Sequence, residues 1–401
     1  MPRCDPHRGR VGATARLTAP TVGIIGAGQL ARMTTQAAIS LAVDVKVLAA
    51  DGSDPACIAA TAVEVGDPGD LNAIRRFAEG CDVVTFDHER VDIAAIAALE
   101  ADGTRVHPSS TTLRFSDKAH QRNEFSAHGL PVPPFNIVNS MSGIDAFAAT
   151  HGWPVVAKTA VGGYDGRGVF VLADMDEARE VLGPLVGHRI VLEPLLDIQT
   201  EIAVIVASRP SGEAVAYPVV ETIQRDGICI ETVTPADIDP CVATGATELA
   251  ISIAELTGAV GILAVEFFVT PDGLLINELA PRPHNSGHWT IEGSVTSQFE
   301  NHLRGILDWP LGATTTTAPA VAMANILGDD SPVDPASRLP LALEVEAAHI
   351  HLYAKATRPG RKLGHVTATG PDRATALGRV RAAVVALGAQ PEPSTTTGVI
   401  Q

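Results

Sequence analysis

The chain has 401 residues, of which 46% are apolar and 19% charged, and its formal net charge is −17. This length exceeds the usual size of one hydrophobic core, so we expect two or three packed domains. The acidic balance argues against a general nucleic-acid-binding protein, because neutralising phosphates requires clustered lysine and arginine. The five cysteines are scattered and never spaced as Cys-x-x-Cys, which disfavours structural zinc and disulfides and fits a reducing cytoplasm.

No segment of the sequence has the features of a membrane span or a secretory signal. The best candidate for a span, residues 251–269, is interrupted by Glu255 and Glu266, and a span needs roughly 18 uncharged apolar residues. Residues 1–20 contain four arginines but no apolar stretch. We therefore expect residues 1–20 to be a disordered extension, with a transit peptide as the less favoured alternative, and we expect no membrane partner.

Residues 21–115 are predicted to form an α/β domain with a Rossmann-like parallel sheet. Apolar runs at 21–26, 43–48 and 82–86 alternate with helix-like segments, which is typical of a parallel sheet covered on both faces. The turn Gly26-x-Gly28-x-x-Ala31 departs from the dinucleotide fingerprint at its last position. Two interpretations stay open for this turn: a phosphate site, formed by Gly26, Gly28, Gln29 and Leu30, and a tight turn alone.

The middle of the chain has a different pattern. Short strands are expected at 155–158, 168–172, 190–193 and 201–207, with little helix between them, which indicates an α+β domain with antiparallel pairing. The low-complexity segment 312–318 is expected to be a linker. A small C-terminal domain over 318–401 is expected to contain strands at 321–327 and 349–353 and a helix at 374–387.

The glycine-rich segment 162–168 is a strong candidate for a phosphate-binding loop. Four of its seven residues are glycine and strands flank it, so it can adopt positive φ angles and lie close to a ligand. Lys158 and Arg167 provide positive charge near the same turn. A flexible surface hairpin is the alternative, which we favour less because it would not require the two converging cations.

Glu266 and Glu278 are predicted to face each other across a hairpin. With a three-residue loop at 271–273, Thr270 would lie opposite Leu274 and Glu266 opposite Glu278. Like charges at facing positions of a sheet repel, and a hard cation such as Mg²⁺ between them removes the repulsion. In the alternative, one of the two carboxyl groups is protonated or turned into water.

The hairpin continues into a polar loop, residues 277–290, whose prolines and glycine exclude a regular helix. Polar loops on rigid hairpins commonly carry binding residues. His284 and His288 are four residues apart, but Pro283 and Gly287 disfavour the helix that a zinc site at this spacing would need. A second basic loop, residues 358–365, would reach an anion if the C-terminal domain folds back.

Several of these segments, GAGQLARM, GGYDGRG, EFFVTPDGLLINELAPRPHNSGHWT, SQFENHLR and RPGRKLGHV, resemble the N5-carboxyaminoimidazole ribonucleotide synthases, ATP-grasp carboxylases of microbial purine synthesis. The similarity covers roughly residues 21–400. It implies a three-domain fold, with an ATP-grasp domain at 116–312 whose small lid lobe spans about 135–195.

The resemblance implies an ATP-dependent carbon–nitrogen ligase that uses ATP and Mg²⁺ to carboxylate 5-aminoimidazole ribonucleotide with bicarbonate, through carboxyphosphate. It also implies a cytoplasmic homodimer with small-molecule substrates. Three alternatives remain: a formate-dependent glycinamide ribonucleotide transformylase of the same fold, a dehydrogenase, and a non-catalytic nucleotide-sensing module.

The resemblance assigns site residues by motif position. The nucleotide would be surrounded by Arg114, Lys158, Gly163, Tyr164, Asp165, Gly166, Arg167, Gly168, Glu193, Pro194, Leu195, Leu196, Glu201, Gln224, Asn277 and Glu278, and Mg²⁺ would be held by Glu266 and Glu278. The ribonucleotide and bicarbonate would be bound by Gly28, Gln29, Leu30, Tyr164, Arg282, His284, Asn285, Ser286, Lys355, Arg361 and Lys362. Catalysis would involve Arg282, His284 and Asp165. The chain departs from the family pattern at Ala31 and at residues 87–90, which leaves open whether Asp87 or Glu89 contacts the substrate.

Overall fold

The computed structural model describes residues 19–163, 168–330 and 333–389. Of the predicted extension at 1–20, only the last two residues are described, and the predicted site residues Tyr164, Asp165, Gly166 and Arg167 lie outside the described ranges. In the described ranges, no helix combines the length and apolar character that a membrane crossing needs.

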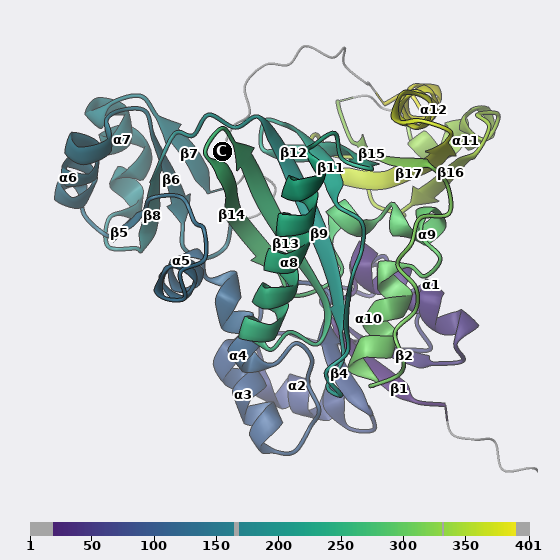
Figure 1. Ribbon diagram of the computed structural model, residues 1–401. Helices are drawn as coiled ribbons and strands as arrows, with labels where there is room; N and C mark the ends of the chain where they lie inside the picture. Colours follow the sequence, from purple (N-terminus) through teal and green to yellow (C-terminus); the bar gives the residue numbers. More distant parts are fainter. Residues whose placement is uncertain (1–18, 164–167, 331–332, 390–401) are drawn as a thin grey trace, which may run out of the picture.

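The N-terminal domain lies at the bottom of Figure 1 and contains a four-stranded parallel sheet in the order β3-β2-β1-β4. Helix α1 packs on one face of this sheet, and helices α2 and α3 cover the other. The predicted parallel sheet covered on both faces is confirmed. The elements are β1 (Thr21–Ile25), α1 (Gln29–Ser40), β2 (Asp44–Ala49), β3 (Ala62–Val65), α2 (Leu71–Ala78), β4 (Val83–Phe86), α3 (Ile93–Ala101), α4 (Ser110–Leu113) and the 3₁₀ helix η1 (Arg114–Ser116).

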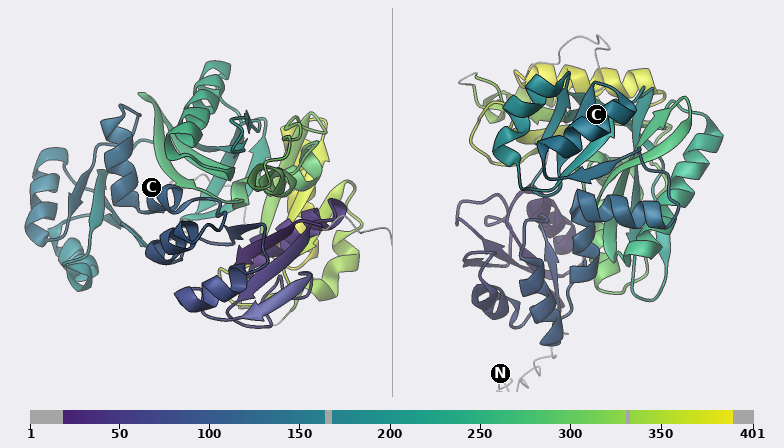
Figure 2. Two further views of the ribbon diagram at one scale, coloured as in Figure 1. Left: turned by 90° about the horizontal axis from the view of Figure 1, so that it is seen from below. Right: turned by 90° about the vertical axis from the view of Figure 1, so that its left-hand side faces the viewer.

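A small lobe projects to the left in Figure 1 and stands apart from the N- and C-terminal domains in the left view of Figure 2. Its antiparallel sheet has the order β5-β8-β6-β7, and helices α6 and α7 bury their apolar sides against it. Its elements are β5 (Asn136–Val138), α6 (Met141–His151), β6 (Val155–Thr159), β7 (Val169–Leu172), α7 (Met175–Leu182), η2 (Gly183–Leu185) and β8 (Ile190–Pro194), preceded by α5 (Lys118–Ala127).

A large antiparallel sheet forms the centre of the molecule and continues into the C-terminal part. Its order in the described ranges is β14-β13-β9-β11-β12-β15-β17-β16, with β10 paired to β9. The elements are β9 (Thr200–Ser208), β10 (Ala214–Ala216), β11 (Val220–Arg225), β12 (Ile228–Thr234), α8 (Pro240–Thr257), β13 (Gly261–Thr270), β14 (Gly273–Ala280), η3 (Asn285–Gly287), α9 (Thr290–Gly293), α10 (Gln298–Ile306), β15 (Ala320–Leu327), η4 (Pro335–Arg338), α11 (Leu339–Ala342), β16 (Ala348–Leu352), β17 (Lys362–Gly370) and α12 (Arg373–Ala386).

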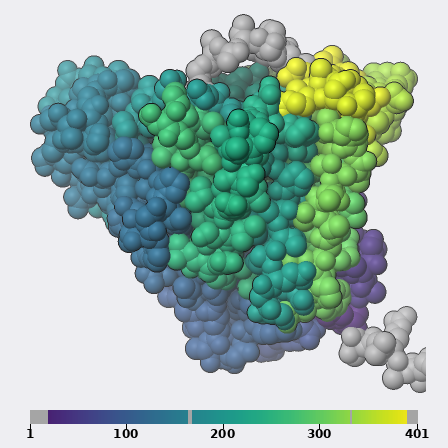
Figure 3. Space-filling view, in the orientation of Figure 1, coloured from purple at the N-terminus to yellow at the C-terminus, as the bar shows by residue number. Residues whose placement is uncertain are grey.

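The C-terminal strands therefore extend the central sheet rather than forming a sheet of their own. Helix α12 packs on them and is tied to the neighbouring strands by ion pairs, of which Arg381 to Glu231 has two contacts of 2.8 and 2.7 Å. The segment 312–318 is anchored, because the Gly312 N–H donates to Asn301 and the Thr314 hydroxyl to the Ala216 carbonyl. The space-filling view shows the C-terminal part at the upper right, against the central sheet (Figure 3).

His302 joins the N-terminal sheet to the central one. Its Nε2 lies 2.9 Å from the Thr85 hydroxyl on β4, and its Nδ1 accepts from the Ile262 N–H on β13. The ring is 1% exposed. Burial lowers the pKa of His302 to about 3, with a smaller contribution from His107. The contact therefore requires a neutral imidazole.

A neutral buried histidine makes stability depend on pH. The ordinary pKa of histidine is about 6.5. Above this pH the imidazole is neutral in both the folded and the unfolded chain. Between about pH 6.5 and pH 3 it binds a proton in the unfolded chain but not in the folded protein. We expect stability to fall as the pH drops from 6.5 towards 3, and His302→Gln to flatten this fall by up to about 1.4 kcal/mol per pH unit. Denaturant unfolding at pH 7 and pH 5 measures this change in the free energy of unfolding, and a variant of an exposed histidine, His128→Gln, serves as the control. The same loss of stability between the two pH values in both variants would contradict the role of His302.

Candidate active site

Strands β13 and β14 place Glu266 opposite Glu278, as predicted. The predicted turn register is wrong: Thr270 lies opposite Gly273, not Leu274. If this register continued unchanged along the hairpin, Glu266 would lie opposite Asn277. A β-bulge next to Glu266 adds one residue to β14, so that Glu266 lies opposite Glu278 instead. The bulge also directs the Asn277 amide oxygen towards Lys158 Nζ, at 3.2 Å.

The two carboxyl groups differ in their surroundings. Burial and the nearby charge of Glu278 raise the pKa of Glu266. Glu278 forms an ion pair with Lys118, which starts α5, and this ammonium lowers the pKa of Glu278 against the opposing effect of burial. Lys158 also lowers the pKa of Glu278, and Lys362 that of Glu266. Two facing carboxylates fit a hard divalent cation, whose preferred ligands are carboxylate and phosphate oxygens.

Lys158, on β6 of the small lobe, belongs to a buried charge cluster. Its ammonium lies 2.8 Å from Glu193 on β8 and 5.5 Å from the centre of the Phe268 ring. The other oxygen of Glu193 accepts from Arg122 Nε at 2.6 Å. Burial opposes ionisation of Glu193, but Arg122 and Lys158 hold its pKa at about 2, so the carboxylate stays ionised. The cluster fixes Lys158 at the edge of the small lobe that faces the central hairpin.

Arg122 is expected to be essential for this cluster. Both side chains of the Arg122–Glu193 pair are buried, at 2% and 0% exposure, so Arg122→Met leaves a buried carboxylate with one partner fewer. We expect a loss of about 3–5 kcal/mol in the free energy of unfolding. The exposed pair of Arg75 and Asp102 provides the control, because Arg75→Met is expected to cost no more than about 1 kcal/mol. Urea unfolding of both variants measures the difference, and similar losses would contradict it.

The predicted nucleotide residues of the lobe edge lie near this cluster. Gly163 and Gly168 flank residues 164–167, which lie outside the described ranges. Gly168 has a φ of +79°, and its carbonyl oxygen accepts a hydrogen bond from the Thr159 N–H. On the central sheet, Gln224 hydrogen-bonds Glu201, whose pKa burial raises to about 7. Of the predicted nucleotide residues at the end of the lobe, Pro194 is the last residue of β8, and Leu195 and Leu196 follow it. Leu195 is 42% exposed.

The polar loop after β14 brings Arg282 and His284 next to the carboxylate pair. Arg282 Nε lies 2.8 Å from Glu89, and His284 Nδ1 lies 3.7 Å from Glu266. The same Nδ1 is 2.9 Å from the Ser286 hydroxyl. Burial, reinforced by the charge of Arg282, lowers the pKa of His284 to about 4, so its imidazole is neutral at pH 7.

The loop is held in place by side chains from neighbouring elements. Gln298 accepts from the His284 N–H at 2.9 Å and donates to the His284 carbonyl at 2.7 Å. Asn285 and Asn325 exchange two amide hydrogen bonds of 2.9 and 2.8 Å. The side chains of the predicted substrate residues Asn285 and Ser286 thus shape the loop. In the described ranges, no three His, Cys, Asp or Glu residues are grouped so that they could hold a metal ion.

The glycine turn before α1 binds an anion from the chain itself. The Gly28 and Ala31 N–H groups donate to the two oxygens of Asp87, at 2.7 and 2.8 Å. A Cβ at Gly28 would collide with this carboxylate. These two amides are therefore not available to a phosphate. The sequence left open whether Asp87 or Glu89 contacts the substrate, and in the structure Glu89 is the one paired with Arg282.

The C-terminal basic loop, which in the structure begins after β16 at Tyr353, reaches the same region. Lys355 hydrogen-bonds Gln29 Oε1 at the start of α1. The charge of Lys362 affects both Glu266 and His284, which places it near them. Arg361 donates to the Ala356 carbonyl at 3.1 Å. Residues from the N-terminal sheet, the central hairpin and the C-terminal loop thus meet at one place.

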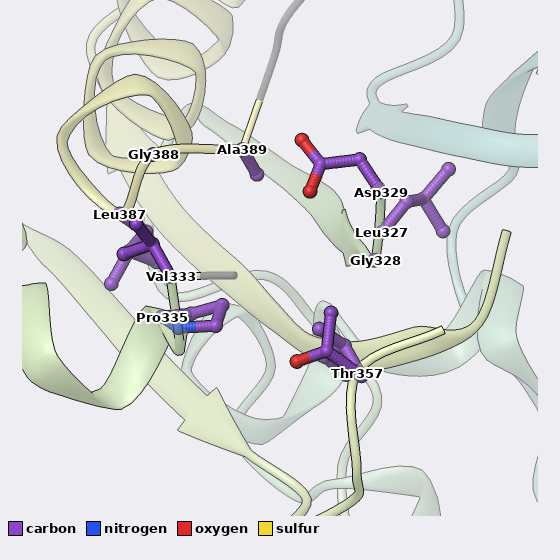
Figure 4. A pocket seen from close by; sticks show the side chains of 10 residues that line it. Leu327, Gly328, Asp329, Val333, Pro335, Thr357, Leu387, Gly388 and Ala389 are labelled. Carbon is purple, nitrogen blue, oxygen red and sulfur yellow. The ribbon is translucent and has the colours of Figure 1, made fainter. Parts of the chain in front are cut away.

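Sequence reasoning missed Lys118 as a member of this site and left the choice between Asp87 and Glu89 open. Arg114, which was predicted, is exposed, whereas Lys118, four residues later, contacts Glu278. A single lysine behind the helix-capping Asp117 gives no signal in the sequence. A separate small pocket of the C-terminal domain, shown in Figure 4, is lined by none of the site residues: its lining is Leu327, Gly328, Asp329, Val333, Pro335, Thr357, Leu363, Leu387, Gly388 and Ala389.

Three family models match successive parts of the chain. A ribonucleotide synthetase preATP-grasp domain matches residues 19–117, an ATP-grasp domain residues 123–299, and a phosphoribosylaminoimidazole carboxylase C-terminal domain residues 321–379. Together with the small antiparallel lobe facing a paired-carboxylate hairpin, they define an ATP-grasp ligase.

The curated and solved relatives narrow this class. The N5-carboxyaminoimidazole ribonucleotide synthase of Mycobacterium tuberculosis is 45% identical over 373 residues, which are 90% of this chain and 86% of the relative. That of Pseudomonas aeruginosa is 37% identical, over 90% of this chain and 97% of the relative. A structure of the Aspergillus clavatus synthase with ADP and 5-aminoimidazole ribonucleotide superposes with a TM-score of 0.85, 32% identity and coverage of 92% and 99%. The chain belongs to the N5-carboxyaminoimidazole ribonucleotide synthase family of purine biosynthesis, and the transformylase alternative is not favoured.

Proposed function

We propose that this chain binds ATP between the small lobe and the central hairpin and uses it to carboxylate the 5-amino group of aminoimidazole ribonucleotide with bicarbonate. The observation that carries the proposal is the facing pair Glu266 and Glu278 beside two ammonium groups, Lys118 and Lys158. Carboxylates and cations at one place are what a metal-bound triphosphate requires.

Mg²⁺ is the metal we propose for Glu266 and Glu278, since the facing carboxylates fit a hard cation. Burial, together with the charge of Glu278, raises the pKa of Glu266, and a bound cation would favour its ionised form. When bound, it would neutralise charge on the phosphate oxygens. Lys158, fixed by Glu193, would hold the phosphates from the side of the small lobe. The predicted nucleotide-binding residues also include Gly163 and Gly168, together with Tyr164, Asp165, Gly166 and Arg167, which lie outside the described ranges.

In the proposed reaction, a bicarbonate oxygen attacks the γ-phosphorus and ADP leaves, which gives carboxyphosphate. The 5-amino nitrogen then attacks the carboxyl carbon, or the CO₂ released from it; phosphate leaves and the nitrogen loses a proton. Arg282, held by Glu89, would stabilise charge on the carboxyl and phosphoryl oxygens. Neutral His284 would hydrogen-bond the bicarbonate, and either His284 or Asp165 would accept the proton.

The remaining predicted contacts complete the proposal. Glu201 and Gln224 would bind the ribose side of ATP, and the backbone of residues 193–196 its base. Gln29, Lys355, Arg361 and Lys362 would bind the ribonucleotide, supported by the contact between Lys355 and Gln29. We also propose a cytoplasmic homodimer, which light scattering of the purified protein tests.

The test of this function is ADP release with pairs of substrates. We expect ADP only when ATP-Mg, bicarbonate and aminoimidazole ribonucleotide are all present. Formate with glycinamide ribonucleotide serves as the second arm and is expected to give background rates. ADP release in the formate arm, or release that does not depend on the aminoimidazole ribonucleotide, would refute the proposal.

A further inference from the structure

Tyr353 and His365 hydrogen-bond across the base of the C-terminal basic loop. Strands β16 and β17 end the loop on both sides, with Leu352 opposite Gly364 and the Tyr353 N–H donating to the Leu363 carbonyl at 2.8 Å. At the next position, the Tyr353 hydroxyl lies 2.6 Å from His365 Nδ1. Both side chains are buried, at 1% and 0% exposure, so this polar contact is shielded from water.

Tyr353 also touches the N-terminal domain at the proposed ribonucleotide site. Its ring packs with Leu30 and Met33 of α1 and with Phe299 of α10. The ammonium of Lys355 lies 5.6 Å from the centre of the same ring and contacts Gln29. One tyrosine thus supports the lysine of the loop and the start of α1 at the same time.

His365 continues the connection to the polar loop of the central hairpin. Its ring lies 5.0 Å from the ring of His288 and stacks on that of His351 at 4.4 Å, with an interplanar angle of 9°. His351 is in turn held by Glu292 at 2.7 Å. His288 lies 3.2 Å from Gln298, the same side chain that fixes the backbone of His284. The basic loop and the His284 loop are therefore packed on one buried set of rings.

From this geometry, and resting on the proposed function, we infer that Tyr353 and His365 are positioning residues that hold Lys355 and its loop in register with Gln29 to bind the ribonucleotide. Neither side chain is proposed to touch the substrate. The loop is fixed at its other end by backbone hydrogen bonds between Gly328 and residues 360 and 361, of 2.9 and 2.8 Å. Losing the Tyr353 contact would therefore release the part of the loop that carries Lys355.

Tyr353→Phe tests this inference because it removes the hydroxyl and keeps the ring. We expect the KM for aminoimidazole ribonucleotide to rise about tenfold while the KM for ATP and kcat change less than about twofold, since a binding group lost equally from ground and transition states affects KM alone. The dissociation constant of the ribonucleotide, measured by calorimetry, is expected to rise by the same factor.

The chain offers a matched control in Tyr217, which is also 1% exposed and donates through its hydroxyl to the Thr296 carbonyl while accepting from Asn301. Tyr217→Phe removes an equally buried hydroxyl outside the basic loop, so we expect a similar loss of thermal stability and no change in ribonucleotide affinity. A conservative pair completes the design: His365→Asn keeps an acceptor near Nδ1 and is expected to bind the ribonucleotide more tightly than His365→Leu.

The outcomes separate the inference from the proposed function. Equal ribonucleotide affinities for Tyr353→Phe and Tyr217→Phe would overturn the inference, as would a Tyr353→Phe variant that loses only stability. If the natural protein binds the ribonucleotide but releases no ADP in its presence, the proposed function fails. The ribonucleotide affinities of the variants still show whether Tyr353 and His365 position the basic loop. A natural protein that binds no ribonucleotide would overturn both.

Discussion

Glu278→Gln is expected to reduce bicarbonate- and ribonucleotide-dependent ADP release by at least about a hundredfold. Glu278 faces Glu266 and pairs with Lys118, so the neutral amide removes a metal ligand and leaves Lys118 without its partner. Initial rates at saturating ATP-Mg measure the effect, and circular dichroism and thermal unfolding show whether the fold is retained.

The control for this variant is Glu221→Gln. Glu221 lies on β11 of the same sheet and pairs with Arg373 at 2.6 Å, away from the hairpin. We expect its turnover to stay within about twofold of the natural protein, because it contacts no proposed site residue. A Glu278→Gln variant as active as this control would remove the basis of the proposed metal site.

Lys118→Met and Arg114→Met are compared because the structure places Lys118 at the site, whereas the motif position predicted Arg114. Lys118 contacts Glu278, whereas Arg114 is exposed. We expect Lys118→Met to lower kcat/KM for ATP by about 100-fold, a charge-assisted contact to phosphate being worth a few kcal/mol. Arg114→Met is expected to remain within about threefold. Steady-state kinetics with varied ATP measures both, and the reverse order would restore the prediction from the motif.

The hairpin shows how far the sequence alone leads. The facing of Glu266 and Glu278 was predicted from a three-residue loop at 271–273. Strand β13 is buried along nearly its whole length, so no alternation of apolar and polar residues fixes its register. The turn register was wrong by one, and the bulge that compensates for it gives no local signal: Asn277 looks like any other strand residue. The bulge is fixed by Lys158, a partner 119 residues away in the chain.

Long-range packing also explains the other differences. Asp87 and Glu89 are two residues apart and chemically alike, and only the fold assigns one to the amides of α1 and the other to Arg282. Strand β17, which was not predicted, begins in a basic, glycine-containing segment with little strand character. Parallel strands at the N-terminus were predicted because buried strands are continuous apolar runs, which is a local property.

The continuity of the central sheet has a consequence for motion. Hydrogen-bonded strands from β14 to β16 connect the carboxylate hairpin to the basic loop, so we expect the proposed metal site and the proposed ribonucleotide site to move together. The small lobe has its own sheet, and its contact with the hairpin includes the single hydrogen bond from Lys158 to Asn277. Opening and closing around ATP would then be a swing of the lobe, with the ribonucleotide pocket already assembled, and the nucleotide rather than the ribonucleotide would set the amplitude of the domain movement.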